Sequence, residues 1–197
     1  MLCIIVISSI VSCAPVLREY YQPQYTNGEL YSTGCSGSGP ADTLRIQLPD
    51  DAKLSIRASI NESRDLNNFY LMFRYYLPEG VELELLRNDV KILSDGIEVG
   101  QFFIENLLTP NWTKEKLDYD KILPTDKIRG ETFQRKTLFG KQDIYRNFSG
   151  SLTGKLPEHY SSCSVVIPEM LIDGIRVEIE PIKFKSIQKL GVDPLNC

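Results

Sequence analysis

Histidine and tryptophan are the scarcest side chains here, because His159 and Trp112 are the only ones of their kind among 197 residues. Protein metal sites usually draw on several His or Cys ligands, so a single histidine excludes most metal centres. A Ser-His-Asp triad would have to use His159, which lies in a polar, turn-like stretch. We therefore interpret His159 as a surface or hydrogen-bonded residue, and we expect no metal, no cofactor and no catalytic residue.

The chain also lacks an excess of basic residues, having 22 Lys and Arg against 26 Asp and Glu, a net charge of −4. Proteins that bind nucleic acid usually carry a strong basic footprint. A nucleic-acid partner is therefore not expected.

Long apolar runs are absent as well. Residues 2–12 form one uncharged, mostly apolar run of eleven residues, and no later run approaches 18 residues. A membrane-spanning helix needs roughly 20 apolar residues, whereas the apolar part of a signal peptide takes roughly 7–15. The pattern predicts export, with the rest of the chain outside the bilayer.

Two cleavage sites are compatible with this start. A cut after Ala14 would be followed by Pro15, which is unfavourable. The alternative, Ile10-Val11-Ser12-Cys13, resembles the lipobox of bacterial lipoproteins. Signal peptides usually begin with positively charged residues, and this chain departs from that pattern because no Lys or Arg precedes Arg18.

That resemblance implies a signal peptide at 1–12 and acyl chains, palmitate among them, on Cys13, which would anchor the protein to a membrane. Ala14 in place of Asp after the cysteine implies the outer membrane of the cell envelope. Residues 13–40 are polar and rich in Gly, Ser and Pro, which predicts a lipidated, flexible tether.

Five cysteines are present, of which Cys3 would leave with the signal peptide and Cys13 would be acylated. In an oxidising compartment, two of the remaining three are expected to form a disulfide bond. We favour Cys35–Cys163, with Cys35–Cys197 as the alternative. In the favoured pairing, Cys197 is free or pairs with a partner chain.

Apolar and polar residues alternate with period two in short segments separated by turn residues. Residues 44–48, 53–60 and 81–85 are the clearest cases, and 69–77 is rich in aromatic residues. This pattern is typical of half-buried strands. It predicts an all-β, antiparallel β-sandwich as a single domain over 41–197. Residues 106–143 are polar and poorly periodic, so we interpret them as an insertion with one short helix near 113–117.

Other patterns allow chemistry but have plainer explanations. Pairs of carboxylates two residues apart could serve as acid and base in glycoside cleavage, but most of them alternate with aliphatic residues as a solvated strand face does. These pairs are Glu82 with Glu84, Asp118 with Asp120, and Glu178 with Glu180.

The aromatic strand could bind sugar, although a core with one exposed face explains it better. Sequons at Asn61, Asn111 and Asn147 are typical of a rival class, secreted glycoproteins.

These observations favour a membrane-anchored lipoprotein of the cell envelope that binds or scaffolds a protein partner and is not an enzyme. The first alternative is an envelope carbohydrate or peptidoglycan hydrolase that uses a carboxylate pair. The second is a surface or pilus-like assembly subunit that accepts a strand at an open sheet edge.

Overall fold

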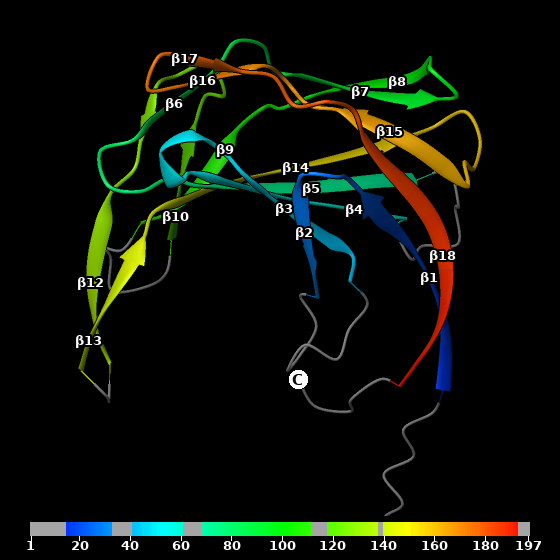
Figure 1. Cartoon of the computed structure of the whole chain (residues 1–197), viewed down its shortest axis with the longest axis horizontal. Coiled ribbons are helices and arrows are strands. Elements are labelled where there is room, and N and C mark those ends of the chain that lie inside the picture. The colour runs from blue at the N-terminus through cyan, green and yellow to red at the C-terminus, as the bar shows by residue number, and fades with distance from the viewer. Residues whose placement is uncertain (1–14, 33–40, 61–67, 112–117, 138–139, 193–197) are drawn as a thin grey trace, which may run out of the picture.

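The computed structural model describes residues 15–32, 41–60, 68–111, 118–137 and 140–192, and these residues form antiparallel sheets (Figure 1). The all-β fold class predicted from the alternation is confirmed. The short helix expected near 113–117 lies outside the described residues. In the described part, no helix is long and apolar enough to cross a membrane.

The largest sheet, here called sheet B, has the order β10-β9-β14-β5-β4-β3-β2. Its strands are β2 (Gly28–Tyr31), β3 (Thr43–Gln47), β4 (Lys53–Ile60), β5 (Asn68–Tyr76), β9 (Leu107–Asn111), β10 (Asp118–Ile122) and β14 (Asn147–Lys155). The 3-10 turn η2 (Pro49–Asp51) joins β3 to β4. Every second residue of β5 is buried, because side chains alternate between the two faces of a strand.

Two smaller sheets lie over one side of sheet B, at the top of Figure 1. Sheet A has the order β1-β18-β15-β7-β8, and sheet C has the order β11-β6-β16-β17. Their strands are β1 (Pro15–Gln24), β6 (Glu82–Leu85), β7 (Asp89–Ser94), β8 (Ile97–Phe103), β11 (Ile128–Arg129), β15 (Ser162–Val166), β16 (Met170–Ile172), β17 (Ile175–Val177) and β18 (Ile182–Val192). A separate hairpin joins β12 (Thr132–Thr137) to β13 (Gly140–Tyr145).

The apolar core fills the space between these layers. Its largest fully buried side chains include Tyr21, Phe69, Tyr75, Phe148 and Phe184. Phe69 joins three elements, since its ring lies 6.3 Å from that of Tyr21 on β1 and 6.3 Å from that of Phe102 on β8. The aromatic strand β5 therefore supplies core residues on one face, as predicted.

The flexible tether predicted for 13–40 is wrong for residues 15–24 and 28–31, which form β1 and β2. Strand β1 pairs with β18 along its whole length, from Pro15 opposite Val192 to Gln24 opposite Lys183. Tyr20 and Tyr21 are buried, so burial of aromatic rings and a long ladder of backbone hydrogen bonds offset the entropy of ordering this polar segment. The tether's Gly-Ser-rich part, 33–40, lies outside the described residues.

The interpretation of 106–143 as an insertion is also wrong in its main feature. Strands β9 and β10 belong to sheet B, and Ser149 of β14 pairs with Leu108 of β9. The segment is polar because β10 is an edge strand with mostly exposed side chains. Edge strands carry charged residues that discourage unwanted pairing, and this composition hides the period-two pattern.

Candidate functional site: a cationic sheet face

The solvent-facing side of sheet B carries a regular array of polar side chains. It lies on the side away from sheet C and from strands β7 and β8 of sheet A, the side toward which the β1–β18 ribbon and the β12–β13 hairpin extend in Figure 1. The register places Arg45 opposite Ser55, and Ser55 opposite Arg74. Lys53 and Arg57 flank Ser55 on β4, on the same face, because alternate residues of a strand share a face.

We call this array the cationic face and define it by Tyr31, Arg45, Lys53, Ser55, Arg57, Arg74 and Tyr76. Two hollows of about 290 and 550 Å³ indent it, and Tyr76 lines both. Four cationic side chains and one carboxylate, Asp51, line these hollows. Two further carboxylates pair with these cations, because Glu29 lies 3.8 Å from Arg45 and Asp42 lies 3.0 Å from Arg57. The four cations therefore outnumber the three neighbouring acids by one, while the chain as a whole carries a net charge of −4.

A neighbouring tyrosine contacts each of two guanidinium groups of the cationic face, those of Arg45 and Arg74. Arg45 lies over the ring of Tyr31, 4.5 Å from its centroid. The Nη1 of Arg74 donates a hydrogen bond of 3.3 Å to the hydroxyl of Tyr76. These contacts orient the two cations by a cation–π interaction and by hydrogen bonding.

Arg57 is held differently, by a carboxylate buried at the edge of the face. Its Nε lies 3.0 Å from Oδ2 of Asp42, whose side chain is 4% exposed. Thr43 donates a second hydrogen bond, of 2.9 Å, to Oδ1 of Asp42. Removal of Arg57 would leave a buried carboxylate without its cation, which is strongly destabilising. Arg57 is therefore part of the fold as well as of the face.

One atom of the Arg74 guanidinium group has no partner. Its Nε is buried and makes no hydrogen bond to any of the described residues, although Nη1 of the same group bonds to Tyr76. Buried polar atoms in native proteins nearly always have a partner, and where no protein group supplies one, an ordered water or an ion commonly does. Beside it on β4 is Ser55, which is 4% exposed and shares a hydrogen bond with the hydroxyl of Tyr31.

The cysteines predicted to form a disulfide bond are only partly described. Cys163 lies on β15, is 2% exposed and forms no disulfide bond with another described residue. Burial raises the pKa of this thiol to about 12, which keeps it protonated and unreactive at neutral pH. Cys13, Cys35 and Cys197 lie outside the described residues, so the lipidation and the pairing stay predictions.

His159 is placed next to an acid, not next to a nucleophile. Its Nε2 lies 3.3 Å from Oε1 of Glu19 on β1. The hydroxyl of Ser186 also bonds to Glu19, so within this group the serine contacts the carboxylate and not the imidazole. The arrangement ties the 156–161 loop to the β1–β18 ribbon and does not form the sequence of contacts of a catalytic triad.

The carboxylate pairs do not line either hollow of the cationic face. Glu82 and Glu178 are exposed, and Glu84 forms an ion pair of 3.5 Å with Lys127. Among the described residues, no group of three or more His, Cys, Asp or Glu could hold a metal ion. Asn147 of the third sequon is half-buried on β14 opposite Tyr76.

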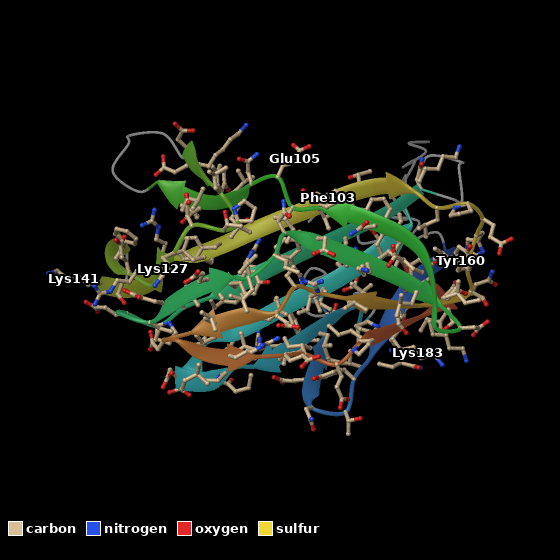
Figure 2. The ribbon with its side chains drawn as sticks, turned by 90° about the horizontal axis from the view of Figure 1, so that it is seen from above. Phe103, Glu105, Lys127, Lys141, Tyr160 and Lys183 are labelled. Carbon is tan, nitrogen blue, oxygen red and sulfur yellow. The ribbon has the colours of Figure 1, made fainter. Side chains whose placement is uncertain are left out.

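A third hollow, of about 550 Å³, lies where β8 and β14 approach each other. Phe103 and Glu105, labelled in Figure 2, line it together with Lys121 of β10. Strand β8 is the edge of sheet A, and Phe103 is 55% exposed. The charges of this hollow are balanced, unlike those of the cationic face.

Sequence reasoning missed the cationic face because its members come from four strands and meet only through the cross-strand register. The available signal was the polar residue at every second place in β4, Lys53, Ser55 and Arg57. No family model, no curated protein and no solved structure matches this chain.

Proposed function

We propose that the protein is a membrane-anchored lipoprotein of the cell envelope that acts as a non-catalytic binding module, with the cationic face as its ligand site. The observation that carries the binding proposal is the set of four cationic side chains, Arg45, Lys53, Arg57 and Arg74, that line the two hollows. Guanidinium and ammonium groups form their strongest hydrogen bonds with anionic oxygens. The ligand proposed here is therefore an anion.

Export and anchoring rest on the resemblance of Ile10-Val11-Ser12-Cys13 to a lipobox. Strand β1 begins at Pro15, so an acylated Cys13 would hold the end of the β1–β18 ribbon close to the membrane surface. Multiple acyl chains give stable anchoring, because each buried CH₂ contributes about 0.8 kcal/mol.

The anchor is tested by Cys13→Ser. We expect wild type in the membrane fraction with the added mass of acyl chains, and the variant in the non-membrane fraction without them, because serine offers no thiol for acylation. Fractionation and intact-mass analysis measure both. Wild type of unmodified mass would contradict the lipoprotein proposal.

The ligand site is tested by Arg74→Gln in equilibrium binding to a panel of polyanions: polyphosphate, oligogalacturonate and vesicles with anionic lipid. A hydrogen bond to a charged group contributes about 1.5–3 kcal/mol. We therefore expect the affinity for the bound polyanion to fall by about tenfold or more.

Lys185→Gln is the matched control. It removes one positive charge from an exposed position of β18, in a different sheet, so it should leave the affinity almost unchanged. Equal losses in both variants would show that only net charge matters, and absence of binding to every polyanion would contradict the proposed site. Thermal unfolding of both variants establishes that they are folded.

A further inference from the structure

We infer that the ligand of the cationic face is an acidic oligosaccharide, an extended chain of sugar rings carrying carboxylates, which lies across β3, β4 and β5. This inference rests on the proposed function and gives its ligand a chemical class. Three features of the face support it: the spacing of the cations, the hydroxyl groups between them and the apolar surface beside them.

The cations are spread over an area larger than one small anion. Arg45 and Arg74 lie two strands apart in the same row, which separates their backbones by roughly 10 Å, since neighbouring strands are about 4.8 Å apart. Lys53 and Arg57 are four residues apart on β4, or roughly 13 Å at about 3.3 Å per residue. An extended ligand with several anionic groups matches this spread.

The guanidinium groups are also held apart and do not converge on one point. Arg45 lies over Tyr31 and 3.8 Å from the exposed Glu29, Arg57 pairs with Asp42, and Arg74 bonds to Tyr76. The remaining N–H groups of each guanidinium point to different places, so separate carboxylates of one extended ligand suit them better than a single small anion.

Hydroxyl groups occupy the space between the cations. Tyr31, Thr43, Ser55 and Tyr76 all line the smaller hollow. Each of them already takes part in one hydrogen bond within the protein. A hydroxyl can make more than one such bond, as donor and as acceptor, so the capacity that remains matches the hydroxyls of a sugar better than phosphate oxygens, which mainly accept.

Apolar surface adjoins the charged groups. Tyr76 lines both hollows, with Met72 in the smaller one and Leu77 and Pro78 in the larger. A tyrosine ring offers an apolar face with a polar tip, which suits the C–H face of a sugar ring lying between two carboxylates.

The shape of the site distinguishes a glycan from a bilayer. Ser55 lines the smaller hollow and is 4% exposed. A flat layer of headgroups meets the rims of such hollows, while a single oligosaccharide chain can enter them. The chain's net charge of −4 also disfavours nucleic acid, whose binding is dominated by phosphate neutralisation.

The test measures binding of four probes by calorimetry: oligogalacturonate, its carboxyl-reduced neutral counterpart, polyphosphate and phosphatidylglycerol vesicles. We expect oligogalacturonate to bind most tightly and the neutral chain to bind at least about tenfold more weakly. Tyr76→Leu should lower the affinity for oligogalacturonate on the order of tenfold and leave weak polyphosphate binding unchanged, because only the sugar uses the ring.

Phe103→Leu is the control for the loss of an aromatic ring, since Phe103 is exposed on β8, outside the cationic face (Figure 2). Two results would overturn the glycan inference and leave the anion site in place. One is tighter binding of polyphosphate or vesicles than of oligogalacturonate, and the other is an unchanged affinity for oligogalacturonate in Tyr76→Leu. Failure of every polyanion to bind would overturn both.

Discussion

Replacing Phe69 by Ala should lower the free energy of unfolding by about 3–5 kcal/mol. The Phe69 ring is 2% exposed and contacts Tyr21 of β1 and Phe102 of β8. Its loss would leave a cavity where the first strand, sheet B and the edge of sheet A meet, and the surrounding backbone is fixed by strand pairing on both sides of β5. Much of a single domain's total stability depends on this site.

Chemical denaturation with urea measures the effect. Phe103→Ala is the matched control, because the same side chain is removed from a position that is 55% exposed. We expect this control to change stability by less than about 0.5 kcal/mol, as surface substitutions usually do. Equal effects in the two variants would contradict the core that we describe.

Replacing Gly130 by Ala should be the most damaging of the small substitutions. A Cβ at this position would lie 1.9 Å from the carbonyl oxygen of Pro78 and 2.8 Å from that of Leu77. Both obstacles are main chain, and Gly130 is fixed by hydrogen bonds with Gly80 and Val81. We expect a loss of about 3 kcal/mol, at the upper end of the usual cost of overpacking, because no side-chain rotation can relieve the contact.

Gly96→Ala provides the comparison. Gly96 has a φ of +81°, yet a Cβ there would meet nothing within 4 Å. This variant should lose only about 1 kcal/mol from backbone strain. A smaller loss for Gly130→Ala than for Gly96→Ala in thermal unfolding would show that the chain at 78–81 can move away from β11.

The sequence predicted those strands whose pattern is local. Leu44, Ile46, Leu54 and Ile56 alternate with polar residues and are buried in β3 and β4, so one face of sheet B could be predicted from period two alone. The aromatic strand β5 was divided correctly into a buried and a solvent-facing side for the same reason.

The features that were missed depend on partners far away in the chain. The β1 segment contains polar residues and Pro23, and only its ladder to β18 makes it a strand. The cationic face depends on register in the same way, because Arg45 and Arg74 are 29 residues apart in the chain (74 − 45) and share a row only through Ser55. A one-residue slip would turn these side chains to the other face, and single-sequence patterns do not encode register.

The pairing of β1 with β18 has a consequence for the time at which the protein can fold. Residue 15 meets residue 192, so the first strand has no partner until almost the whole chain has been synthesised. Contacts this distant in sequence slow folding, because a very large loop must close first. Until then the backbone groups of β1 have no strand to bond to, so we expect the β1–β18 ribbon to be among the last parts of the described fold to close.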